Sequence, residues 1–339
     1  MRTPSTAPAD QCCFVFIHRV TVGLAVLLAS CIGLTAVSAA QTGKWPDKPV
    51  RIIVAAGPGG VDDFVTRLIA PKLGELLGQQ IVAENRPGAG GMIGQTFVLK
   101  SPPDGYTLLL AGGSMAGARY VNANVNYDVL RDFTPVSLVV TTQFVMLVHP
   151  TVPARNLREY IALARSQPGK MTYGMIGAGQ IPYWSALLFN SMAGIKAVEV
   201  TYKDGAAAII DVAAGRVDYY FAGAVTAAAN KAKLRAFAVT GSTRSPIFPE
   251  VPTIAEAALP DYEMTGWGSI MGPAGMRRDI VDSLNAAIGR TLAMPEIRDR
   301  MQNAGAEATP STPDALARTY ADWVERFGKI AKQAGIKPQ

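Results

Sequence analysis

The apolar residues of this chain recur in two alternating patterns that predict strands and helices in turn. The first strand is predicted for the β-branched, apolar run from residue 50 to 54. Residues 57–60, Gly-Pro-Gly-Gly, cannot continue a strand and favour a tight turn. Apolar residues at helical spacing then predict a helix over 65–77. The first turn of a helix has free N–H groups, so this glycine turn is a candidate anion site.

The same alternation continues along the chain and predicts an α/β fold with mostly parallel sheets and two lobes. Further strands are predicted over 80–84, 106–111, 136–148 with a polar break at 141–143, 171–176, 198–202, 217–221, 234–240 and 264–271. Helices are predicted over 92–99, 156–166, 183–192, 204–214, 253–258, 278–294, 295–304 and 313–334.

Small-residue turns follow strands in both halves of the chain. They lie at 57–60 and 112–114 in the first half, and at 177–180 and 222–223 in the second. In open α/β sheets, ligands bind where strands end in such turns. Turns that face each other across two lobes would form a cleft lined by backbone N–H groups.

Composition and charge agree with a well-buried protein of two domains. The chain has 339 residues, of which 49% are hydrophobic and 17% charged, and these values are typical of globular rather than disordered proteins. The formal net charge of +6 is spread along the sequence, without a run of Lys or Arg. Nucleic-acid binding is therefore not expected.

The N-terminus predicts a secretory signal peptide over residues 1–40. His18 and Arg19 precede an apolar run from 20 to 30, and small residues follow it, with cleavage expected after Ala40. An alternative is a lipobox at 28–31, which would place a lipid on Cys31. Simple cleavage is preferred because the apolar stretch continues past Cys31 to Val37.

Cleavage there would remove all three cysteines and one of the two histidines, which leaves His149. Disulfides, thiolate metal sites and cysteine nucleophiles are then not expected, and neither a metal nor a cofactor is predicted. His149 lies at the end of an apolar strand, so a structural role is expected for it.

Nucleotide and enzyme functions receive little support. The glycine run at 88–91 suggests a dinucleotide site, but the G-x-G-x-x-G template requires a glycine where Ile93 stands. Asp62 and Asp63 are adjacent on the predicted helix, so their carboxyl groups splay apart and do not converge as a catalytic pair. Two roles remain open for them: capping the helix by its dipole, or meeting a cationic group on a ligand.

Several short motifs, taken together and in order, are specific for one family. They are 45–51 (WPDKPVR), 58–60 (PGG), 84–91 (ENRPGAGG), 103–108 (PDGYTL), 202–203 (YK), 234–236 (LRA), 238–241 (AVTG), 244–246 (RSP) and 251–256 (VPTIAE). The set resembles the Bug (Bordetella uptake gene) family, the periplasmic solute-binding proteins of tripartite tricarboxylate transporters. The resemblance covers essentially the whole chain from Trp45 to Lys337.

The resemblance implies a periplasmic-binding-protein fold of type II, a Venus flytrap with two crossovers. Lobe 1 would comprise 45–143 and 266–339, and lobe 2 would comprise 144–265. The ligand site implied by the turns consists of Gly57, Pro58, Gly59, Gly60, Asp62, Asp63, Gly112, Gly113, Ser114, Gly177, Ala178, Gly179, Gln180, Tyr183, Ala222 and Gly223. Catalytic residues are not implied.

The function implied by the resemblance is capture of a small carboxylate in the periplasm and its delivery to the permease subunits of a tripartite transporter. A monomer is expected. An alternative is a ligand-dependent sensor that presents its closed form to a membrane signalling kinase. The sequence does not separate the two, because both partners would respond to lobe closure.

The chain departs from the family pattern around the expected pocket. The family usually has an aromatic residue at Ala56, Gly-Thr at 61–62, Ser or Thr within 180–182, His at Tyr183 and Asp near Ala222. Aromatic residues gather nearby instead, at 183–184 and 219–220, whereas Trp267 is expected in the core. The departures predict a roomier site and a carboxylate ligand with an apolar or aromatic body.

Overall fold

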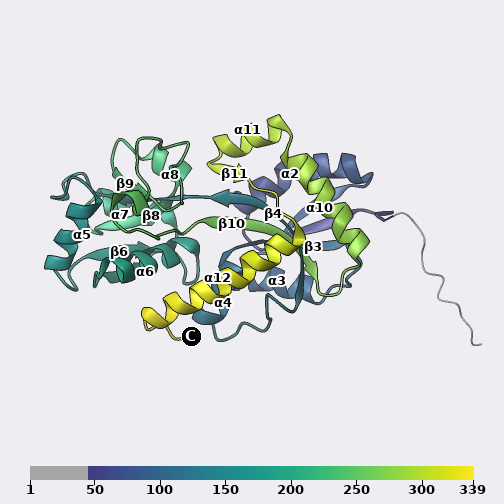
Figure 1. The fold of residues 1–339 in the computed structure, drawn as a ribbon, viewed down its shortest axis with the longest axis horizontal. Helices are drawn as coiled ribbons and strands as arrows, with labels where there is room; N and C mark the ends of the chain where they lie inside the picture. The colour runs from purple at the N-terminus through teal and green to yellow at the C-terminus, as the bar shows by residue number, and fades with distance from the viewer. Residues whose placement is uncertain (1–44) are drawn as a thin grey trace, which may run out of the picture. The chain divides into compact units, whose positions relative to one another are not determined.

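The computed structural model describes residues 45–339, and two β-sheets form the framework of this part of the chain (Figure 1). The strand order is β11-β4-β10-β3-β1-β2 in the six-stranded first sheet and β7-β6-β8-β5-β9 in the five-stranded second sheet. Residues 1–44, which include the predicted signal peptide and Cys31, lie outside the described residues.

The first sheet contains the strands nearest the two ends of the described chain. Its strands are β1 (Val50–Val54), β2 (Ile81–Asn85), β3 (Thr107–Gly112), β4 (Phe133–Thr142), β10 (Gly266–Pro273) and β11 (Ala306–Ala308). The helices that accompany them are α2 (Val61–Leu77), η1 (Ala89–Gly91), α3 (Met92–Leu99), α4 (Ser114–Val121), α10 (Arg278–Leu292), α11 (Pro295–Asn303) and α12 (Pro313–Gln333).

The second sheet is built from the middle of the chain. Its strands are β5 (Phe144–Val148), β6 (Thr172–Met175), β7 (Val198–Thr201), β8 (Tyr219–Gly223) and β9 (Arg235–Val239). Its helices are α5 (Leu157–Ser166), α6 (Ile181–Ala193), α7 (Gly205–Ala213), α8 (Ala224–Ala229) and α9 (Ile254–Ala257). The strands of each sheet fall within the ranges expected for one lobe, and the exact lobe boundaries stay a prediction.

The chain crosses between the sheets twice, as expected, but the sheets are mixed rather than mostly parallel. The outward crossing is at Gln143, between β4 and β5, where the sequence predicts a polar break. β10 returns to the first sheet and pairs antiparallel with both β3 and β4, and β5 pairs antiparallel with β8 and β9. Parallel pairing is confined to β1 with β2 and β3, and to β6 with β7 and β8. The strand by which the chain enters each sheet at a crossing, β10 in the first sheet and β5 in the second, runs against the strands of the strand–helix–strand units in that sheet.

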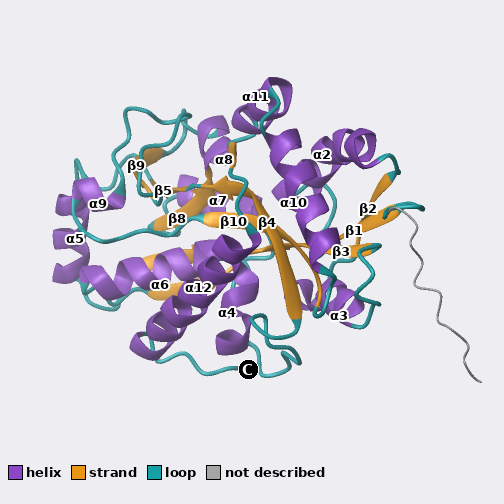
Figure 2. Cartoon of the chain, turned by 45° about the vertical axis from the view of Figure 1, so that its right-hand side comes forward, coloured by secondary structure: helices purple, strands orange, loops and turns teal. Residues whose placement is uncertain are grey.

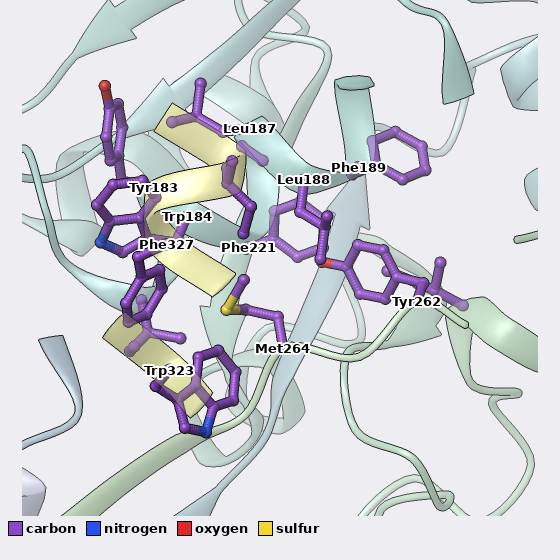
Figure 3. Close-up of a cluster of buried hydrophobic side chains, with 14 of the residues drawn as sticks. Tyr183, Trp184, Leu187, Leu188, Phe189, Phe221, Tyr262, Met264, Trp323 and Phe327 are labelled. Atoms are coloured by element: carbon purple, nitrogen blue, oxygen red, sulfur yellow. The ribbon is translucent and has the colours of Figure 1, made fainter. Parts of the chain in front are cut away.

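One hydrophobic core continues across both sheets. It contains Ile53 and Leu109 from the first sheet, Met146 and Phe221 from the second, and the apolar stripe of α12. Helix α12 packs against α4 and α6, as Figure 2 shows. Trp184 on α6 and Phe327 on α12 meet with their ring centroids 4.6 Å apart (Figure 3). A separate cluster fills the opposite face of each sheet.

Candidate functional site

The turns after β3 and β6 come together at one small cavity. Ser114 from the first turn and Ala178, Gly179 and Gln180 from the second line this cavity, whose volume is about 40 Å³. A Cβ on Gly179 would lie 2.8 Å from Cγ2 of Val121 on α4, and Gly179 has a φ of +86°. Only glycine suits this close approach and backbone conformation. The two predicted turns therefore meet across the junction between the sheets.

The helices that follow the predicted turns have no side-chain cap. Helices α2, α4, α6 and α8 begin after Gly60, Gly113, Gln180 and Gly223, and none of these residues makes a side-chain cap hydrogen bond. By contrast, Asn156, Asp204, Thr253 and Thr312 cap α5, α7, α9 and α12 through their side chains. First-turn N–H groups without such a cap are available to an anion.

The turn after β1 does not line the cavity, and part of its hydrogen-bonding capacity is used internally. Residues 58–60 are exposed, and the Gly59 N–H donates to Oδ2 of Asp63 at 3.0 Å. Asp63 is buried, and its Oδ1 accepts from Nε of Arg67 at 2.9 Å. Asp63 thus ties the turn to its own helix.

The carboxylate of Asp62 has different neighbours from that of Asp63. A Cβ added to Gly268 would lie 3.3 Å from Oδ1 of Asp62, and a Cβ added to Gly112 would lie 3.6 Å from Oδ2 of Asp62. Gly112 is the last residue of β3 and pairs with Gly268, which lies near the start of β10. The same Cβ position on Gly112 is 3.7 Å from Oγ of Ser114. The carboxylate of Asp62 therefore faces the strand ends beside the turn that lines the cavity, and burial raises its pKa to about 6.

Comparison with known proteins identifies the family. The family model described as "Tripartite tricarboxylate transporter family receptor" matches residues 65–336. The chain belongs to this family. Protein BugT of Bordetella pertussis is 32% identical over 90% of this chain and 94% of its own length.

Solved structures of similar proteins have the same fold. Rpa4515 of R. palustris, solved with adipate, is 32% identical, covers 87% of this chain and all of its own, and gives a TM-score of 0.76. MatC (Rpa3494) from Rhodopseudomonas palustris, solved with bound malate, is 30% identical, covers 85% of this chain and all of its own, and gives a TM-score of 0.72. This receptor family consists of periplasmic binding proteins rather than enzymes.

Gly177 is exposed and does not line the small cavity, whereas Tyr183, Ala222 and Gly223 lie in the core or at its edge. Tyr183 is 5% exposed and packs edge-on against Trp184, and burial raises its pKa to about 12. Ala222 is buried in β8, and Gly223 ends that strand. Trp184, Tyr219, Tyr220 and Trp267 are also buried. None of these residues lines the small cavity.

Sequence reasoning missed one wall of the cavity. Ala89, Gly90, Met92 and Gln95, from η1 and α3, line it together with Tyr127, whose hydroxyl donates to Oε1 of Gln95 at 2.8 Å. The glycine run after β2 is itself a turn of small residues that follows a strand, and this is the sequence signal that indicates the wall.

A larger cavity of about 310 Å³ lies elsewhere. It is lined by residues 141–143 at the first crossing, by 243–247, and by Arg298, Gln302 and residues 305–308. None of the predicted site residues lines it, and Arg244 in its wall is engaged by Glu256 at 2.9 Å. We favour the small cavity because two uncapped helix starts from different sheets meet there.

Residues 45–339 lack two further features. Within this range, no helix combines the length and the apolar character needed to cross a membrane. The same range contains no group of three or more His, Cys, Asp or Glu residues that could hold a metal ion.

Asp63→Asn is expected to lower the free energy of unfolding by about 1–3 kcal/mol at pH 7, because it leaves the Gly59 N–H and Arg67 with a weaker partner. Burial alone would raise the pKa of the Asp63 carboxyl, but the Gly59 N–H and Arg67 outweigh it and lower the pKa. A lowered pKa gives stability that is present above the unfolded pKa of about 3.9 and is lost as pH falls through the folded pKa. The deficit should therefore shrink in urea titrations below pH 4.

Asp62→Asn is the matched variant, and it is expected to raise the free energy of unfolding at pH 7, whereas Asp63→Asn lowers it. The pKa of Asp62 is raised to about 6 in the folded state. The stability of the protein that is present below the unfolded pKa is therefore lost as pH rises through the folded pKa. Because Asp62 keeps a part-exposed edge, asparagine is expected to recover about 1–2 kcal/mol at pH 7 and nothing below pH 4. Equal effects of the two substitutions at pH 7 would contradict these assignments.

Proposed function

We propose that this chain is a periplasmic solute-binding protein that holds the carboxylate of a small acid between the turns at 112–114 and 177–180. It then delivers the acid to the membrane subunits of a tripartite tricarboxylate-type transporter. One observation carries the proposal: two helix starts without side-chain caps, one from each sheet, meet at a shared cavity. Adipate and malate in the solved relatives agree with a carboxylate ligand.

Main-chain capture is strong enough for such a ligand. A hydrogen bond to a charged group contributes about 1.5–3 kcal/mol, and a helix N-terminus adds about 0.3–1 kcal/mol. Three such bonds approach the roughly 8 kcal/mol of micromolar binding before the cost of association is subtracted. Burial of an aliphatic body, at about 25 cal/mol per Å², supplies the remainder.

The turns must separate for a ligand to enter. A cavity of about 40 Å³ has room for only a few water molecules, whereas an acid of four to six carbons is larger. The chain connects the sheets at Gln143 and between β9 and β10, so we propose rotation about these two crossings. A ligand that contacts both turns binds the closed state better and shifts the population toward it.

The proposed ligand body is aliphatic. The aromatic residues that suggested an aromatic ligand, at 183–184 and 219–220, are buried in the core. Tyr127 is the aromatic side chain that lines the cavity, and its hydroxyl is bonded to Gln95. Export to the periplasm through the predicted signal peptide is part of the same proposal.

A panel of acids tests this function. Malate, succinate, adipate and short amino acids at 10 mM are expected to include at least one ligand that raises the unfolding temperature by about 4 °C, as binding at about 100 times the Kd would do. Adipamide, which has the length of adipate without its charge, is the control and should give no shift. The proposal is contradicted if adipamide stabilises the protein as strongly as the acids do. It is also contradicted if none of these compounds stabilises the protein.

A further inference from the structure

An acidic side chain stands beside the proposed anion site. The neighbours of Asp62 on β3 and β10 are two glycines, Gly112 and Gly268. Each carboxylate oxygen of Asp62 lies within 4 Å of the position that a Cβ would occupy on one of these glycines. Ser114 Oγ lies within 4 Å of the same position on Gly112, so the Asp62 carboxylate and the Ser114 hydroxyl are less than 8 Å apart. Asp62 does not itself line the small cavity, but it lies within reach of the other end of a ligand whose carboxylate is bound at Ser114.

Asp62 has no compensating partner within residues 45–339. Its carboxylate takes part in none of the salt bridges or side-chain hydrogen bonds of this part of the chain. Arg67, on the same helix, is engaged by Asp63 and Asn85, and Arg86 is engaged by Glu84. From α12, Tyr320 faces this region, and its hydroxyl is bonded to Ser269 at 3.0 Å.

An unpaired carboxylate in this place disfavours a second negative charge. The far carboxylate of a dicarboxylic acid would approach Asp62 with the same sign of charge, in a region where burial already opposes ionisation of Asp62. An ammonium group would instead form a charge-assisted hydrogen bond and supply the missing partner. The two flanking glycines leave space for it.

We propose that Asp62 receives the cationic nitrogen of the ligand, so that the preferred solute is an amino acid type zwitterion with a short aliphatic chain between ammonium and carboxylate. This inference rests on the proposed carboxylate site and adds the chemistry of the opposite end of the ligand. The side chain of Asp62 is then a specificity-determining contact, whereas Asp63 serves the turn.

Two matched pairs of probes test the assignment by isothermal titration at pH 8, where Asp62 is ionised. The pairs are adipate with 5-aminopentanoate and succinate with 3-aminopropanoate, in which an ammonium nitrogen replaces one carboxylate. The amino acid of at least one pair is expected to bind at least about tenfold more tightly than its dicarboxylate, since a charged hydrogen bond contributes that much.

Asp62→Asn is expected to weaken binding of the amino acid about tenfold or more and to leave dicarboxylate binding unchanged or stronger. The control is Asp279→Asn, which also removes a first-turn acid, on α10, where Asp279 pairs with Arg277. It should change neither affinity. Folding of both variants is checked by their unfolding temperatures.

The outcomes separate the two proposals. If the dicarboxylates bind and the amino acids bind no better, or if Asp62→Asn weakens both probes of a pair equally, the role of Asp62 is overturned and the carboxylate site stands. If no probe binds the unaltered protein, the carboxylate site itself is overturned, and the role of Asp62 with it.

Discussion

Replacement of Trp184 by alanine is expected to lower the free energy of unfolding by about 3–5 kcal/mol, the usual cost of removing a buried aromatic side chain. The Trp184 side chain is fully buried, and its ring packs on Phe327 of α12 at 4.6 Å. Its ring atoms also lie 2.9–3.0 Å from the Cβ position of Gly117 on α4. Trp184 therefore joins a helix of the second sheet to two helices that accompany the first.

Trp184 also supports the proposed site. Its Nε1 donates to the Gly179 carbonyl oxygen at 2.9 Å, so the indole fixes the turn that lines the cavity. Trp184→Phe keeps an aromatic ring and removes this hydrogen bond, and is expected to retain most of the stability while weakening ligand binding. Urea denaturation and titration with the tightest acid measure the two effects. A cost below about 1 kcal/mol for Trp184→Ala would show that this packing is not part of the stable core.

Gly113→Ala is expected to lower the free energy of unfolding by about 1–3 kcal/mol, the usual cost of overpacking. An added Cβ would lie 2.5–2.8 Å from ring atoms of Trp267, which is itself buried and packs edge-on against Tyr320. The Gly113 N–H also donates to the Trp267 carbonyl oxygen at 2.7 Å, so the turn cannot move away from the ring without losing this bond.

The matched control for Gly113 is Gly223→Ala. Gly223 also follows a strand and precedes a helix, but its Cβ position has no heavy atom within 4 Å. This substitution should change stability by less than about 0.5 kcal/mol. Similar losses for the two variants in urea denaturation would show that contact with Trp267 does not explain the requirement for glycine at 113.

Hydrophobic periodicity predicted the helices and strands whose pattern depends only on residues close together in the sequence. The stripe at 316, 320, 323, 327 and 330 predicted a helix over 313–334, and these residues are buried along α12 (Pro313–Gln333). A helix was predicted over 156–166, and Asn156 caps it: its Oδ1 accepts from the Glu159 N–H at 3.0 Å. Such features depend on residues close in sequence, so the sequence alone indicates them.

Elements that depend on distant contacts were not predictable in the same way. Helix α4 has small residues at 116–118, and its tight packing depends on Trp184 and Phe327, far along the chain. Strand β11 has three residues and exists through pairing with β4. Hydrophobic periodicity does not indicate strand direction either. The strands β5 and β10 were predicted, but their antiparallel pairing was not.

The candidate site was anticipated in part. The small-residue turns at 112–114 and 177–180 were predicted to face each other, and the structure brings Ser114 and Gly179 to one cavity. The turn at 57–60 was expected beside them and contributes no lining residue. Sequence could not distinguish Asp62 from Asp63, because the difference lies in side-chain direction: Asp63 turns back to Gly59, and Asp62 faces Gly112 and Gly268.

A crystal structure of the protein with its tightest acid tests the central claim most directly. The account predicts one ligand carboxylate within about 3.2 Å of a main-chain N–H from the start of α4 and of another from residues 178–183. The account is contradicted if the carboxylate lies in the cavity lined by residues 141–143 and 243–247, or if it touches the turn of one sheet alone.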